Sequence, residues 1–319
     1  MKLFPTVTVL IPTFNHERWI DFCLNSVLNQ TYKHLEIIVV DDCSSDSTFE
    51  IAQKFSCRNI SVVRNHENLG CSRSLNSIMN GIKSKYIAIV SGDDAWMIEK
   101  IETQVEFMEQ NIGVDLCFTD TVTLNESNTI GPRFPYFHPE NRTRPQWISS
   151  LFGGNFIPAM SAMFRNSSWF LNNRFDPSLR QLQDWEYWIR AICDGLKFHI
   201  IQSPLTLYRV LPDSISNQVS QEKMARSRFE VRVCLQTFKR LPIGELRGVF
   251  ENIFENHPLY AVDRSNEVCL ALLASTVDQG PYQQFAAELL HEYYRNGTHL
   301  ITDLDYHNFI GSLQRLAVH

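Results

Sequence analysis

Short apolar runs alternate with stretches of helical periodicity along the first 120 residues. The apolar runs, which predict buried strands, are residues 7–11, 35–40, 60–64, 86–90 and 114–119. Apolar residues recur at helical spacing in 17–30, 48–55, 72–82 and 98–110. Strands that alternate with helices of this length predict an α/β fold with a mostly parallel, Rossmann-like sheet flanked by helices.

Beyond residue 120 the pattern loosens. Residues 125–145 are polar, contain Gly and Pro, and predict a long surface loop or lid. A strand is predicted at 161–164, a helix at 182–193, and an extended segment at 198–208 that Pro204 interrupts. From Gln221 onward the chain is predicted to be mainly helical. We therefore expect a sheet domain over 1–215 and a helical C-terminal region over 216–319.

Three of the predicted strands end in polar clusters: Thr13-Phe14-Asn15, Asp41-Asp42 and Ser91-Gly92-Asp93-Asp94. Parallel strands bring their carboxyl ends to one edge of a sheet, where α/β proteins bind ligands. Adjacent carboxylates repel each other unless a cation lies between them and the ligand. Mg²⁺ or Mn²⁺ is typically held by one or two carboxylates together with substrate phosphates. The alternative for Gly92-Asp93-Asp94 is a solvated turn.

These side chains suit a nucleotide diphosphate. Phe14 could stack on a base, and Asp42 could accept a hydrogen bond from it. Asp93 could then hold the ribose hydroxyls, and Asp94 the metal. Each has a structural alternative, because Phe14 would also fit a core position and Asp41 or Asp42 could cap the following helix.

A second candidate site lies on the last predicted helix of the sheet domain. Asp184 and Glu186 are two residues apart, so on a helix they point about 200° away from each other and only one can face a given site. A carboxylate ringed by Trp185, Tyr187 and Trp188 would be partly desolvated, which raises a pKa toward that of a general base. The alternative is an amphipathic helix with its acids in water.

The composition of the chain limits the kinds of molecule that it can bind. A net charge of −6 argues against a nucleic-acid binder, which needs a basic surface, but it does not exclude a nucleotide. The eight cysteines are scattered without a Cys-x-x-Cys pair, as expected of reduced thiols in a cytosolic protein. No uncharged apolar run is long enough to span a bilayer, so we expect a soluble chain. The bases of the C-terminal region do not form one helical stripe, and peripheral membrane association is left open.

The ordered set of motifs resembles glycosyltransferase family 2. The resemblance is carried by 9–15 (VLIPTFN), 26–32 (SVLNQTY), 35–47, Asn68-Leu69-Gly70, Ser91-Gly92-Asp93-Asp94 and 183–186 (QDWE). These motifs cover the first two thirds of the chain, and their order is more specific than any one of them. The resemblance implies an inverting, metal-dependent enzyme of GT-A fold, with the donor site in 1–120 and the acceptor and base side in 121–215.

The resemblance also implies roles for individual residues. The donor, most often a UDP-sugar, would be bound by Pro12, Thr13, Phe14, Asn15, Glu17, Asp42, Arg73, Ser91, Gly92 and Asp93. Asp94 would bind the cofactor, Mn²⁺ or Mg²⁺, and Asp184 would be the catalytic base. Trp185, Glu186 and Arg209 would lie on the acceptor or diphosphate side.

Four positions depart from the family pattern: Gln183 for Glu, Ser91 for Asp, Leu75 for Arg and Leu211 for His. Because Ser91 carries no negative charge, more of the metal's positive charge would have to be neutralised by Asp94 and the diphosphate. The basic residue nearest to the missing Arg is Arg73, which could pair with phosphate or be solvated. Tyr208-Arg209 and Ser214-Ile215-Ser216 resemble the family's closing loop.

The expected reaction is a direct displacement in which Asp184 takes the proton of an acceptor hydroxyl, and the product has the inverted configuration. The acceptor would be a glycan or lipid-linked saccharide in the synthesis of a surface polysaccharide such as O-antigen or capsule. We expect the protein in the cytoplasm or on the inner face of the cell membrane, and a homo-oligomer is left open. One alternative is a phospho-acceptor receiver domain, which begins with its acid-pair strand, whereas another strand precedes Asp41-Asp42 here. The other is a non-catalytic nucleotide-sugar binder or assembly partner.

Overall fold

The computed structural model describes residues 4–211, 220–255, 257–297 and 300–313. They form two compact units, each built from several stretches of the chain. The described residues within 1–141, 156–184 and 196–218 form the first, which we call the sheet unit. Those within 142–155, 185–195 and 219–319 form the second, the helical unit. Two stretches of the predicted sheet domain, 142–155 and 185–195, therefore group with the C-terminal helices.

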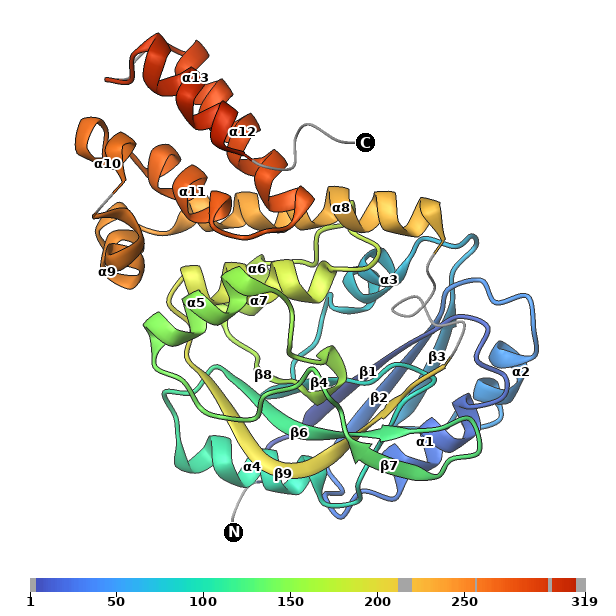
Figure 1. Ribbon diagram of the computed structural model, residues 1–319. Coiled ribbons are helices and arrows are strands. Elements are labelled where there is room, and N and C mark those ends of the chain that lie inside the picture. The colour runs from blue at the N-terminus through green and yellow to red at the C-terminus, as the bar shows by residue number, and fades with distance from the viewer. Residues whose placement is uncertain (1–3, 212–219, 256, 298–299, 314–319) are drawn as a thin grey trace. The chain divides into compact units, whose positions relative to one another are not determined.

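The sheet unit contains a mixed sheet that has nine strands within the described residues. Their order is β3-β2-β1-β4-β8-β6-β9-β5, with β7 paired to β6. The strands are β1 (Val7–Thr13), β2 (Leu35–Asp41), β3 (Ile60–Arg64), β4 (Tyr86–Ile89), β5 (Ala95–Trp96), β6 (Leu116–Leu124), β7 (Ile130–Arg133), β8 (Met163–Arg165) and β9 (Phe198–Arg209). β1 to β4 run parallel, and β8 pairs antiparallel with β4 and β6 (Figure 1). The predicted α/β class is confirmed.

Helices cover the strands of the sheet unit. They are α1 (Ile20–Leu28), α2 (Thr48–Gln53), α3 (Cys71–Ile78), α4 (Lys100–Gln110) and α6 (Ser168–Asn172), with a short 3-10 turn at Ala159–Ser161. All seven residues of β1 are buried, as expected for a parallel strand with covered faces. Cys23 and Leu24 of α1 pack in one core cluster with Val9, Ile11 and Val39 of the first two strands. This packing fixes the strand ends that carry the polar clusters.

The predicted loop over 125–145 is only partly a loop. Residues Ile130–Arg133 form β7, and α5 (Arg144–Gly153) starts at the end of the predicted loop. Thr143 and Gln146 form a capping box at the start of α5, a local signal that the apolar pattern does not contain. β9 continues through Pro204, where its register with β6 shifts, because proline cannot donate to a sheet ladder.

The helical unit confirms the prediction of a mainly helical C-terminal region. Beside α5 it contains most of α7 (Gln183–Cys193), whose residues belong to this unit from Trp185 onward. The remaining elements are α8 (Gln221–Gln236), a 3-10 turn (Thr237–Arg240), α9 (Ile243–Phe254), α10 (Pro258–Val262), α11 (Asn266–Ser275), α12 (Gly280–Arg295) and α13 (Asp303–Ser312). The ring of Phe152 makes edge contacts with Phe238, Phe250 and Tyr282 in its core. Within the described part of the chain, no helix has the length and apolarity to cross a bilayer.

Candidate active site

The ends of β1, β2 and β4 meet at one edge of the sheet, as predicted. Thr13 and Asp41 are partners in the parallel register of β1 and β2. Beyond the strands, the Asp42 N–H donates to the Thr13 carbonyl (2.9 Å) and the Gly92 N–H donates to the Pro12 carbonyl (3.0 Å). The three polar clusters of the sequence therefore lie beside one another.

The loop after β4 packs tightly against the loop after β1. A Cβ on Gly92 would collide with Thr13 Oγ1 and lie 2.9 Å from His16 Nδ1, so glycine is required. His16 Nδ1 is 3.2 Å from Thr13 Oγ1, and its Nε2 is 3.8 Å from Asp93 Oδ2. His16 therefore lies beside these residues, and the sequence analysis did not single it out. A lone histidine in the turn between β1 and α1 carries no pattern of its own.

The two adjacent acids have different environments. Asp94 is 2% exposed, and its Oδ1 accepts a hydrogen bond from the Arg209 N–H (2.7 Å). Burial, and secondly the charge of Asp93, raise the pKa of Asp94 well above its ordinary value, although Arg209 opposes the shift. The side chain of Asp93 is 19% exposed, and its Oδ1 has no hydrogen-bond partner. Asp93 therefore keeps a buried carboxylate oxygen that no protein group satisfies.

A metal would find two adjacent carboxylates at this edge of the sheet, those of Asp93 and Asp94. In the described residues, no three side chains of His, Cys, Asp or Glu gather into a metal cluster. Mg²⁺ and Mn²⁺ need fewer, because one or two carboxylates suffice when substrate phosphates supply the other oxygens. The buried, unpartnered Oδ1 of Asp93 fits that arrangement because a cation would satisfy it, whereas Oδ1 of Asp94 already accepts a hydrogen bond.

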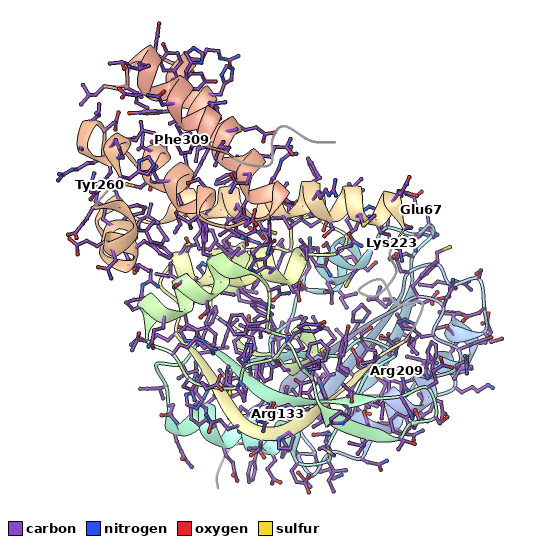
Figure 2. All side chains as sticks on the ribbon, viewed as in Figure 1. Glu67, Arg133, Arg209, Lys223, Tyr260 and Phe309 are labelled. Carbon is purple, nitrogen blue, oxygen red and sulfur yellow. The ribbon has the colours of Figure 1, made fainter. Side chains whose placement is uncertain are left out.

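Arg209, the last residue of β9 (labelled in Figure 2), is bonded to the loop after β4. It is 1% exposed, and its Nε donates to the Asp93 carbonyl (2.6 Å). Its other two nitrogens donate to the carbonyl of Asn125 and to Oδ1 of Asn128. Every nitrogen of this guanidinium is bonded to protein, whereas the resemblance implied a place on the acceptor or diphosphate side.

Asp42 is buried and organises the turn that precedes α3. Its Oδ1 accepts from Asn65 Nδ2, the Leu69 N–H and Ser74 Oγ, and its Oδ2 accepts from the Gly70 N–H. The four bonds occupy both carboxylate oxygens, so base recognition by this residue stays a prediction. Asp41 does not cap α2, because its Oδ2 accepts from the Ser44 N–H and pairs with Arg64.

The other residues predicted to bind the nucleotide-sugar fall into two groups: exposed side chains, and side chains that are buried or bonded to protein. Phe14 is 40% exposed, and Arg73 is exposed without a hydrogen bond or ion pair among the described residues. Asn15, at φ 54°, accepts from the Ser45 N–H through its Oδ1 (2.9 Å). Glu17 accepts from the Ser47 N–H through its Oε2 (2.9 Å). Pro12, Thr13 and Gly92 are buried, and Ser91 is half-buried.

Helix α7 divides its two acids between the units. Asp184 belongs to the sheet unit and is half-buried. Burial of the Cys71 thiol, together with the negative charges of Asp184, Asp42 and Asp93, raises its pKa to about 12. Asp184 therefore lies near the same thiol as the acids at the ends of β2 and β4.

Trp185 and Glu186 belong to the helical unit and are bonded there. Trp185 donates to the Leu151 carbonyl (2.9 Å). Glu186 accepts from Arg190 Nε and Nη2 (3.0 and 2.8 Å). Both side chains have partners in this unit, and their predicted place on the acceptor side is untested. The predicted closing-loop residues 214–216 lie outside the described residues.

Comparisons with known proteins agree with this architecture. The model of the family named Glycosyl transferase family 2 matches residues 8–169. An uncharacterized glycosyltransferase of Methanocaldococcus jannaschii, MJ1057, is 29% identical over 225 residues, which are 69% of this chain and 76% of the relative. The Escherichia coli enzyme WfaP, named UDP-Glc:α-D-GlcNAc-diphosphoundecaprenol β-1,3-glucosyltransferase, is 36% identical over 103 residues, 32% of this chain and 41% of the relative.

Solved structures share the fold. S. aureus TarS 1-349 in complex with UDP-GlcNAc matches with a TM-score of 0.61 at 17% identity, covering 97% of this chain and 90% of that chain. The mixed, mostly parallel sheet with flanking helices is therefore the GT-A fold that the resemblance implied. The chain belongs to glycosyltransferase family 2 and is a glycosyltransferase.

Proposed function

We propose that the chain transfers a sugar, with inversion, from a UDP-sugar to a hydroxyl of a saccharide or lipid-linked saccharide acceptor. The observation that carries the proposal is the meeting of the ends of β1, β2 and β4, where the N–H groups of Asp42 and Gly92 donate to the carbonyls of Thr13 and Pro12. The negative charges of Asp42, Asp93 and Asp184 act together on the pKa of the Cys71 thiol in the same unit. The name of WfaP contains a UDP-sugar and a lipid-diphosphate-linked saccharide, and the TarS complex contains UDP-GlcNAc. Both support this choice of substrates.

In the proposed reaction, Asp184 accepts the proton of the acceptor hydroxyl while that oxygen attacks the anomeric carbon. The bond from that carbon to the diphosphate breaks, and UDP leaves from the opposite face. Phe14, with 40% of its surface exposed, stacks on the uracil. Arg73, exposed near the start of α3, pairs with a phosphate.

We assign the divalent cation, Mn²⁺ or Mg²⁺, to Asp93 in place of Asp94. Asp93 has an unpartnered Oδ1, whereas Asp94 is buried and accepts from the Arg209 N–H. His16 Nε2 lies 3.8 Å from Asp93 Oδ2, which is within ion-pair range but beyond hydrogen-bonding distance. A cation bound there would neutralise charge on the diphosphate.

The test is UDP release by the full chain. A panel of UDP-sugars is offered with a GlcNAc-diphospho-lipid acceptor, in the presence of Mn²⁺, Mg²⁺ or a chelator. We expect acceptor-dependent UDP release that the chelator removes and that Asp184→Asn lacks while it still binds UDP in calorimetry. Wild-type protein that binds UDP and releases none with any acceptor would support the non-catalytic alternative. Near-normal transfer by Asp184→Asn would remove that residue from the role of base.

The setting of the reaction is part of the same proposal. A lipid-linked acceptor implies synthesis of a surface polysaccharide at the inner face of a membrane. Co-sedimentation of the protein with anionic vesicles tests peripheral association. Light scattering on the purified chain tests for the homo-oligomer.

A further inference from the structure

Helix α3 connects the acid at the end of β2 with the segment that leads into Asp184. At its start, Ser74 Oγ donates to Asp42 Oδ1 (2.9 Å), and the N–H of Gly70 donates to Asp42 Oδ2 (2.7 Å). The first residue of the helix is Cys71, whose thiol is close enough to Asp184 for the two to interact electrostatically. The helix therefore lies between the nucleotide side and the base side of the sheet unit.

Two side chains of α3 hold the backbone of residues 175–179. Asn76 Nδ2 donates to the Phe175 carbonyl (2.8 Å), and Asn76 Oδ1 accepts from the Phe175 N–H (3.0 Å). Ser72 Oγ donates to the Leu179 carbonyl (3.1 Å), and both of these residues are buried. The Asn76 side chain can do both because an amide carries a donor nitrogen and an acceptor oxygen. The segment is thus fixed at two points, four residues apart.

Side-chain contacts flank these two anchors. Arg174 Nη2 donates to Asn80 Oδ1 (2.9 Å), just beyond the end of α3. Arg180 Nη1 donates to Asn68 Oδ1 (3.3 Å), and its guanidinium occupies the space where a Cβ on Gly70 would lie. The segment therefore follows the helix from one end to the other before it reaches the start of α7.

We propose that Asn76 and Ser72 are positioning residues that fix Asp184 relative to the donor. The proposal rests on the function of Asp184 as the base. Asp42 is bonded to the same helix, so the nucleotide side and the base share one rigid element. A reacting group that moves by about 1 Å can lose about 100-fold in rate, so loosening this segment lowers the rate without removing a group that touches substrate.

Two variants and a matched control test the proposal in the full chain. Asn76→Ala is expected to lower kcat for UDP release about tenfold or more and Ser72→Ala about threefold, with the KM for the donor unchanged within about twofold. The control is Asn80→Ala, which removes a contact to the Arg174 side chain and none to the backbone of the segment. Its kcat should stay within about twofold of wild type.

Hydrogen exchange supplies a readout other than activity. In Asn76→Ala the Phe175 amide loses its acceptor, so amides of 175–184 should exchange at least about tenfold faster than in wild type, while those of β1 and β2 keep their rates. If Asn76→Ala does not fold, Ser72→Ala, which removes one hydroxyl, carries the test.

The outcomes separate this inference from the proposed function. Loss of transfer in Asp184→Asn with wild-type kcat and exchange in both α3 variants overturns the positioning role and leaves the base in place. Normal transfer by Asp184→Asn overturns the proposed function itself. A fall in kcat that is matched by an equal rise in donor KM would also contradict the inference, because it would place α3 in donor binding.

Discussion

The molecule has two pairs of neighbouring acids, one after β4 and one at the start of α7. The fold gives the members of each pair different environments, by a different means in each case. Asp93 and Asp94 are adjacent in a loop, and burial separates them: Asp94 accepts from the backbone of Arg209, and Asp93 keeps an oxygen without a partner. Asp184 and Glu186 are two apart on a helix, and rotation separates them, so that Glu186 is bonded to Arg190. In each pair one carboxylate, that of Asp94 or Glu186, is bonded to protein and stabilises the fold. The other, that of Asp93 or Asp184, is the one proposed to take part in the reaction.

The largest expected effect distinguishes the acids of α7. Asp184→Asn should lower kcat about 1,000-fold, equivalent to about 4 kcal/mol in the barrier, because the variant lacks the proposed base. Glu186→Gln should keep kcat within about tenfold but lower the melting temperature, since the bidentate bond to Arg190 is broken. UDP release and calorimetry on both variants measure this. An equal loss of kcat in Asp184→Asn and Glu186→Gln would contradict the assignment of different roles to the two acids.

The next effect concerns the arginine that holds the loop after β4. Arg209→Met should lower the free energy of unfolding by about 3 kcal/mol. The carbonyls of Asp93 and Asn125 and Oδ1 of Asn128 lose a buried donor, and Asp94 keeps its backbone hydrogen bond but loses a neighbouring positive charge. Urea unfolding measures it. The control is Arg18→Met, whose ion pair with Glu126 is exposed, and which should cost less than about 1 kcal/mol. Similar losses in both would mean that the burial of Arg209 contributes little.

A smaller effect separates the two acids after β4. Asp93→Asn should lower kcat about 100-fold, about 2.7 kcal/mol, and weaken Mn²⁺ binding in the presence of UDP. Asp94→Asn keeps an oxygen for the Arg209 N–H, so it should lose no more than about tenfold. Titration of Mn²⁺, followed by electron paramagnetic resonance, checks binding independently of turnover. The reverse order would return the metal to Asp94, where the sequence analysis placed it.

Local pattern predicted the sheet better than it predicted the site. The run over 35–40 lies within β2 (Leu35–Asp41), since a largely buried parallel strand reads as an apolar segment. Short elements such as β7 and α6 were missed because neither has enough turns or alternation to show a period. The convergence of three strand ends followed from topology. By contrast, the role of Arg209 depends on Asp93, Asn125 and Asn128, partners distant in sequence that only the fold brings together.

Asp94 is a buried acid that has a positively charged neighbour, Arg209, whereas Lys100 at the start of α4 is a buried base that has no such partner among the described residues. In the part of the chain described, no carboxylate lies at ion-pair distance from Lys100. Its Nζ donates to Gln104 Oε1 (2.7 Å) and lies 4.2 Å from the centroid of the Trp96 ring. Burial lowers the pKa of Lys100 to about 7, whereas an unfolded lysine keeps its proton up to about pH 10. Between these values the unfolded state binds more protons, so the free energy of unfolding rises with pH.

Replacing Lys100 with methionine should therefore stabilise the protein, and most at low pH. Lys100→Met is expected to raise the free energy of unfolding by about 2 kcal/mol at pH 6.5, with a gain that shrinks as pH approaches 10. Urea unfolding at pH 6.5, 8 and 9.5 measures the gain, with the exposed Lys83→Met as the control that should show none of this dependence. A gain that is the same at all three pH values would mean that folded Lys100 keeps its proton over this range, as an unfolded lysine does. The buried lysine would then carry its charge without the loss of stability that is expected of an unpaired buried charge.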